Sequence, residues 1–81
     1  MVKLNQLQTT SGFHLYLHFD DGTEKTIDMN SEIGNDTLTK PLQDPAYFEQ
    51  VKIYENGRGV FWPNGFDMCP DFLRHHTQQV R

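Results

Sequence analysis

The chain has 81 residues, of which 36% are hydrophobic, and its 7 basic and 11 acidic side chains give a net charge of −4. This length predicts one small domain with a thin core, and no apolar run approaches the ~20 residues that a membrane-spanning helix needs. The basic residues are scattered, whereas binding to phosphates needs a basic stripe. We therefore expect a single domain over residues 1–81 that binds neither nucleic acid nor membranes directly.

The first residues lack the apolar stretch of a signal peptide, and the single cysteine cannot form a disulfide within the chain. These two features favour a cytoplasmic location.

Residues 2–8 form a weak strand pattern with Val2, Leu4 and Leu7, which needs a bulge to keep one face buried. A turn cluster follows at residues 9–12. Residues 13–19 alternate strictly between apolar and polar side chains, which predicts a half-buried strand. Its core-facing residues are predicted to be Phe13, Leu15, Leu17 and Phe19.

The Asp-Gly pair within residues 20–23 predicts a hairpin turn, and residues 24–29 read as the returning strand. Lys25, Ile27 and Met29 share one face of that strand. Because a lysine stem can lie along apolar surface while its charge stays hydrated, we expect the Lys25 ammonium in water at the edge of the core.

Residues 30–43 read as a loop that could contain one helical turn. Asp44 is a capping residue and Pro45 fits the first helical position, which predicts a short helix over residues 45–50 anchored by Phe48. Residues 51–54 and 60–62 read as two strands joined by a glycine-containing loop. Pro70 is predicted to begin a final helix that reaches about His76, and residues 77–81 form a polar tail, so the ordered core spans about 2–76.

This order of elements predicts an α+β fold. We expect a single small antiparallel sheet made of two hairpins plus the N-terminal strand, with one or two short helices over its apolar face.

One candidate interaction surface is the polar face of the strand at residues 13–19, where Tyr16 lies between His14 and His18. The two histidine α-carbons are ~13 Å apart in a strand, which is too far to share one metal ion. A solvated strand face explains these residues, and an interface that contacts a partner is the functional alternative.

The second candidate is the segment Trp62–Leu73, which combines a strand end, a turn and a helix start. Its Trp62, Asn64, Asp67 and Asp71 form either a structural lock or a binding surface. We expect Trp62 to cover the sheet edge near the final helix, and Asp67 or Asp71 to cap that helix. A carboxylate pair with separated pKa values could instead perform acid–base chemistry.

Cys69 precedes a helix start, where a thiol can become reactive, but the sequence supplies no orienting group or oxyanion site for it. His75 and His76 are adjacent and diverge on a helix, and Cys69 with these histidines matches no zinc spacing. We therefore predict no catalytic residue, no metal site and no cofactor.

Three stretches resemble a small bacterial family, the domain of unknown function 2442. They are Phe19-Asp20-Asp21-Gly22 with Ile27-Asp28, the stretch Leu42-Gln43-Asp44-Pro45-Ala46-Tyr47-Phe48, and Trp62-Pro63-Asn64-Gly65-Phe66-Asp67-Met68-Cys69-Pro70-Asp71-Phe72-Leu73. The resemblance covers about Leu4 to Leu73, and the Trp-Pro-Asn-Gly-x-Asp element is its most specific part. It implies a compact α+β domain without an established enzymatic activity. Some members resemble the smaller partner of a toxin–antitoxin pair, and others resemble the N-terminal half of helix-turn-helix regulators.

These observations predict a non-catalytic protein-interaction module, an antitoxin-like partner of a small basic toxin encoded nearby. A homodimer also stays open. The alternative is a small-ligand-binding protein or an enzyme that uses the Trp62–Asp71 region. The acidic balance suits a basic partner, and the hairpins leave sheet edges that a partner could extend.

Overall fold

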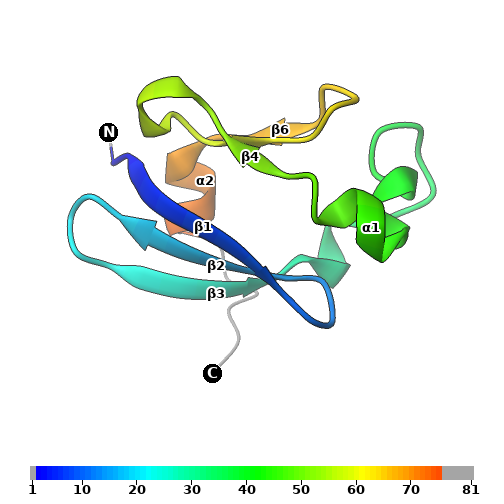
Figure 1. Cartoon of the computed structure of the whole chain (residues 1–81), viewed down its shortest axis with the longest axis horizontal. Coiled ribbons are helices and arrows are strands. Elements are labelled where there is room, and N and C mark those ends of the chain that lie inside the picture. Colours follow the sequence, from blue (N-terminus) through cyan, green and yellow to red (C-terminus); the bar gives the residue numbers. More distant parts are fainter. Residues whose placement is uncertain (1, 76–81) are drawn as a thin grey trace.

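The computed structural model describes residues 2–75 and contains two small antiparallel sheets (Figure 1). The strands of the first sheet, in spatial order, are β1 (Leu4–Thr10), β2 (His14–Phe19) and β3 (Glu24–Asp28). Those of the second are β4 (Lys52–Ile53), β5 (Val60–Phe61) and β6 (Asp67–Met68). The predicted α+β class is confirmed, but the prediction of a single sheet is wrong, because the two hairpins belong to separate sheets.

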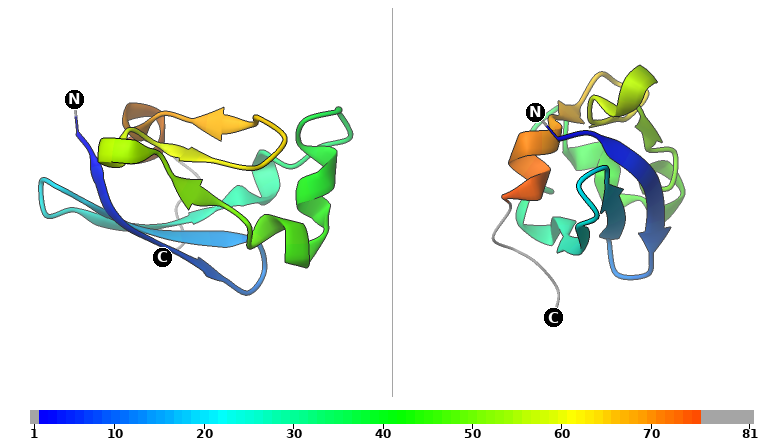
Figure 2. Two further views of the ribbon diagram at one scale, coloured as in Figure 1. Left: turned by 45° about the horizontal axis from the view of Figure 1, so that its top comes forward. Right: turned by 90° about the vertical axis from the view of Figure 1, so that its left-hand side faces the viewer.

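Within residues 2–75, five short helical segments connect and cover the sheets. The α-helices are α1 (Pro45–Phe48) and α2 (Pro70–Arg74). The 3-10 segments are η1 (Met29–Ser31), η2 (Lys40–Gln43) and η3 (Glu55–Gly57). Figures 1 and 2 show the first sheet below the second, with α1 at one end and α2 beside the other end. The two sheets and the helices therefore enclose one core.

The first sheet follows the alternation of its sequence. Leu15, Leu17 and Phe19 of β2 have no solvent exposure, as predicted. On β3 the buried face consists of Lys25 and Ile27, and Met29, which begins η1, is also buried, again as predicted. The pairing of β1 with β2 shifts between Leu4 and Gln6, which is the expected bulge.

Phe13 departs from the predicted strand. It lies in the turn between β1 and β2 with a φ of 64°, a value that is uncommon for a residue with a side chain. Its ring is half-buried and meets the edge of the Phe48 ring at a centroid distance of 5.4 Å. Phe13 thus packs against the core from the turn rather than from the strand.

The second sheet approaches the first at η3. Gly57 has a φ of 71°, and a side-chain carbon there would collide with the backbone of Leu4. Gly59 has a φ of 129°, and a side-chain carbon would collide with the carbonyl of Met68. These two glycines therefore permit the close backbone contacts that join η3 to β1 and bring β6 beside the β4–β5 hairpin.

Two carboxylates organise the connection before β4. Asp36 accepts hydrogen bonds from the backbone N–H groups of Leu38 and Thr39 and from the Thr39 hydroxyl. The backbone N–H of Ala46 donates to Asp44, and Pro45 follows that cap, so the predicted helix start is confirmed. Helix α1 itself is shorter than the predicted span of residues 45–50.

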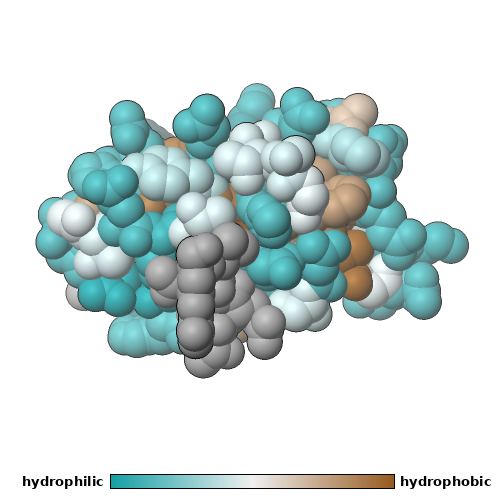
Figure 3. All heavy atoms as spheres, turned by 90° about the horizontal axis from the view of Figure 1, so that it is seen from below, coloured by the Kyte–Doolittle hydropathy of each residue, from teal (hydrophilic) through white to brown (hydrophobic). Residues whose placement is uncertain are grey.

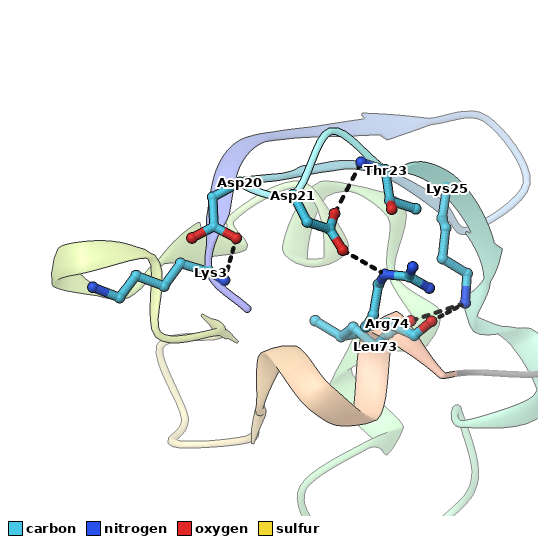
Figure 4. Close-up of polar contacts among 7 residues, drawn as sticks. All are labelled: Lys3, Asp20, Asp21, Thr23, Lys25, Leu73 and Arg74. Carbon is cyan, nitrogen blue, oxygen red and sulfur yellow. Dashed lines mark hydrogen bonds and ion pairs between the residues drawn. The ribbon is translucent and has the colours of Figure 1, made fainter. Parts of the chain in front are cut away.

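Lys25 joins β3 to the last turn of α2 (Figure 4). Its ammonium donates to the carbonyl oxygens of Leu73, at 3.2 Å, and Arg74, at 2.8 Å. The prediction of a hydrated ammonium is therefore wrong, because the end of α2 leaves carbonyl groups that need donors. Burial, and then the nearby Arg74 charge, lower the pKa of Lys25 below its usual 10.5. Arg74 in turn contacts Asp21 at 3.2 Å, which ties α2 to the β2–β3 turn.

Candidate functional site

The outer face of the first sheet carries nine aligned side chains. They are Gln6, Gln8 and Thr10 of β1, His14, Tyr16 and His18 of β2, and Glu24, Thr26 and Asp28 of β3. The three β2 residues are half-buried, as expected for the central strand of a sheet that is open on one side. This arrangement confirms the predicted facing of His14, Tyr16 and His18.

Tyr16 is the aromatic centre of this outer face. Its hydroxyl donates to the carboxylate of Glu24 on the neighbouring strand, and this bond raises the pKa of Tyr16 above its usual 10.0. His14 lies opposite Asp28, and His18 lies opposite Glu24. The face therefore combines one phenol ring with two carboxylates and two imidazoles, a composition that suits a polar protein interface.

Trp62 belongs to the core and not to the surface. It has no solvent exposure, and its indole N–H donates to the carbonyl oxygen of Phe48 at 3.0 Å. Its ring packs against Phe48 and Phe66, with centroid distances of 5.9 Å and 5.6 Å. Trp62 was predicted to cover the sheet edge near the final helix. That position is wrong, because its indole N–H and its ring contacts are directed to α1 and to the turn before β6.

Asn64 holds the turn that follows Trp62. Its backbone N–H donates to the Tyr47 hydroxyl at 2.9 Å, and its side-chain amide donates to the carbonyl of Leu38 at 2.9 Å. Its side-chain oxygen accepts from the backbone N–H of Phe66 at 3.1 Å. The backbone N–H of Asn64 therefore connects this turn to α1, and its side chain connects the turn to the loop before η2, as a structural lock requires.

The predicted carboxylate cap of α2 is wrong. Asp67 lies in β6 and accepts a hydrogen bond of 2.6 Å from the Tyr54 hydroxyl, which raises the pKa of Tyr54 above 10.0. The capping side chain is Cys69, whose sulfur accepts from the backbone N–H of Phe72 at 3.5 Å. Asp71 is exposed in the first turn of α2. Strand β6 was not predicted, because its two residues are too few to produce an alternating pattern, and its pairing draws Asp67 away from the helix.

An aromatic pair on the second sheet was also not predicted. Tyr54 and Phe61 stack with their ring centroids 4.5 Å apart, and Tyr54 is 36% exposed. The cross-strand pairing of Phe61 with the exposed Lys52 places the Phe61 ring on the solvent-facing side of the second sheet. The predicted strands at residues 51–54 and 60–62 each contain one member of this pair. Aromatic side chains on paired strands often contact each other, so the pair could have been predicted from the sequence.

Several open clefts lie on the surface of the described residues. A cleft of about 270 Å³ lies between the β1–β2 turn and α1, with Phe13, Phe48 and Glu49 in its lining. Among residues 2–75, no group of three or more histidine, cysteine or acidic side chains is placed to hold a metal ion. Cys69 is exposed and serves as the cap of α2, while His75 follows that helix and His76 lies outside the described residues, as does the predicted tail at 77–81.

No helix in the described part of the chain is both long enough and apolar enough to cross a membrane.

The fold and these contacts define a small α+β domain in which the outer face of the first sheet is polar. A family model described as "Protein of unknown function (DUF2442)" matches residues 5–79, so the chain belongs to this family. The resemblance inferred from the sequence is therefore confirmed. No curated protein and no solved structure matches the chain.

Proposed function

We propose that this chain is a non-catalytic protein-interaction module, an antitoxin-like partner of a small basic toxin. The supporting observation is the outer face of the first sheet, where Tyr16 is presented between His14 and His18 on a central strand. Aromatic side chains within a polar surface are common at protein interfaces. The net charge of −4 favours encounter with a basic protein.

The alternative, ligand binding or catalysis in the Trp62–Asp71 region, has less support. Trp62 is fully buried there, and Asn64 and Asp67 make contacts within the domain. These side chains therefore have structural roles that account for their positions.

The direct test is co-expression with the product of the neighbouring gene, followed by affinity purification and a growth assay. We expect a complex and relief of growth inhibition by the neighbouring toxin. Association should slow as salt rises past ~0.15 M, where the Debye length is ~8 Å. A chain that purifies alone, relieves no toxicity and turns over a substrate would reject the proposal.

Tyr16→Ala and Tyr54→Ala form a matched pair of variants for this complex. Each removes one tyrosine whose hydroxyl donates to a carboxylate, from the first or the second sheet. Loss of an interface aromatic typically weakens binding by roughly 5- to 30-fold. We expect that loss for Tyr16→Ala and little change for Tyr54→Ala. A larger loss of binding for Tyr54→Ala than for Tyr16→Ala would place the interface on the second sheet.

A further inference from the structure

A cleft of about 550 Å³ lies between the residues before β1, the end of η3 and the start of α2. Within residues 2–75 its lining consists of Lys3, Arg58, Cys69 and Pro70, and is more apolar than polar. Small-molecule sites commonly occupy about 300–1,000 Å³. Although the whole chain has a net charge of −4, this described lining carries two cations and no carboxylate.

Two buried glycines hold Arg58 between the other members of this lining. A side-chain carbon at Gly57 would lie 3.2 Å from the β-carbon of Lys3. A side-chain carbon at Gly59 would lie 3.3 Å from the α-carbon of Cys69. Both distances are shorter than ordinary van der Waals contact, so glycine permits an approach that a larger residue would prevent. The two glycines therefore bring the chain at Arg58 against Lys3 on one side and against Cys69 on the other.

The Lys3 ammonium and the Arg58 guanidinium form no ion pair within residues 2–75. Figure 4 shows the Lys3 side chain extended, with its ammonium directed away from the Asp20 carboxylate, which accepts the backbone N–H of Lys3 instead. Glu55 and Asp71 are exposed on η3 and α2, and neither carboxylate lines the cleft. The two cations of the cleft are therefore available to a negatively charged ligand.

We propose that this cleft binds a small organic anion, in which an apolar body carries an oxyanion group. The Arg58 guanidinium donates two parallel N–H groups to two oxygens of a carboxylate or phosphate, and the Lys3 ammonium adds a second charge. The aliphatic stems of these two side chains and the sulfur of Cys69 contact the apolar body. The site is separate from the outer face of the first sheet, which contributes none of these groups. Figure 3 views the molecule from below, and the surface outside the grey atoms there is largely hydrophilic, unlike the lining of the cleft.

Cys69 supplies an internal reporter, because it is the single cysteine of the chain and is exposed in the cleft. Its thiolate attacks one sulfur of an aromatic disulfide, the S–S bond of the reagent breaks, and an absorbing aromatic thiolate leaves, while the thiol proton passes to water. The rate with dithionitrobenzoate, which carries two carboxylates, is divided by the rate with neutral dithiodipyridine. Because a change in the reactivity of the thiol affects both rates, this ratio reports the attraction of the cleft for an anion.

Lys3→Met with Arg58→Met removes both charges but keeps apolar stems, and should lower the rate ratio roughly 2- to 30-fold. The matched control is Lys40→Met with Lys52→Met, which makes the same change in net charge at exposed residues of η2 and β4. We expect the control to alter the ratio by less than about twofold at physiological salt. Both double variants should keep the melting temperature of the parent, because all four side chains are exposed. Equal losses in the two double variants would show a general effect of net charge and overturn the proposal.

Phenyl phosphate and benzoate, titrated at constant ionic strength, identify the oxyanion. Each should slow the reaction of Cys69 with neutral dithiodipyridine in the parent chain, and should not do so in the variant that lacks Lys3 and Arg58. The anion that acts at the lower concentration identifies the preferred group, phosphate or carboxylate. The amide signals of Lys3, Arg58 and Cys69 in the isotope-labelled chain should shift in the same titration. Equal slowing by inorganic phosphate would show attraction of any anion, and no slowing by either aryl anion would show that no ligand occupies the cleft. Either result would overturn the proposal.

Discussion

Replacement of Lys25 by methionine tests whether one buried ammonium holds α2 against the first sheet. Methionine keeps the buried stem but removes the donor to the carbonyls of Leu73 and Arg74. Hydrogen bonds to a charged group contribute about 1.5–3 kcal/mol each. The desolvation that lowers the pKa of Lys25 opposes this gain, so we expect a net loss of about 2 kcal/mol. In a domain of this size, that loss lowers the melting temperature by about 8–16 °C.

Thermal and urea unfolding measure the change, and Lys52→Met is the matched control because Lys52 is exposed on β4. The control should stay within about 0.5 kcal/mol of the parent. Hydrogen exchange supplies a local measurement, since the Leu73 and His75 amides, which donate within α2, should lose protection in Lys25→Met alone. Equal stability of the two variants would refute the argument that the ammonium anchors α2.

Three further predictions concern the core, the second sheet and the loop before η2. Leu17→Ala should reduce the free energy of unfolding by about 2–5 kcal/mol in urea titrations, because Leu17 is fully buried in the first sheet. Asp67→Asn should leave the melting temperature nearly unchanged but return the pKa of Tyr54 toward 10.0, as read from tyrosinate absorbance, since the carboxylate bond raises it. Hydrogen bonds from Thr39 and Leu38 lower the pKa of Asp36 below 3.8. The stabilisation that the ionised Asp36 carboxylate provides is therefore present above pH 3.8 and lost as the pH falls through its folded-state pKa. Asp36→Asn should make the melting temperature less dependent on pH in that range.

Local patterns predicted the first sheet and the start of α1. The alternation at residues 13–19 established which side chains of β2 are buried, because a strand has a period of two and one face must be covered. Asp44 and Pro45 predicted the helix start, because capping involves atoms within two residues of each other. For the same reason, the outer-face position of Tyr16 and its neighbouring histidines followed from the sequence.

The roles within the Trp62–Leu73 segment depended on distant residues. Asp67 was expected to cap α2 because it is close in sequence, yet its partner is Tyr54, which lies across the second sheet. Asn64 binds groups of Leu38 and Tyr47, more than a dozen residues away, and no local pattern encodes such a pairing.

The sequence by itself determined the family, through the resemblance of its motifs. It also determined the α+β class and the buried face of each long strand, because these depend on the order of local patterns and on short-range periodicity. Only the tertiary structure decided that the hairpins form two sheets, since Gly57 and Gly59 permit backbone contacts whose partners are remote in the chain. It also decided the position of the Lys25 ammonium. The carbonyl groups at the end of α2 reach the ammonium of the lysine on β3 only when the helix packs on the sheet. That packing buries the ammonium together with the carbonyl groups that accept its hydrogen bonds.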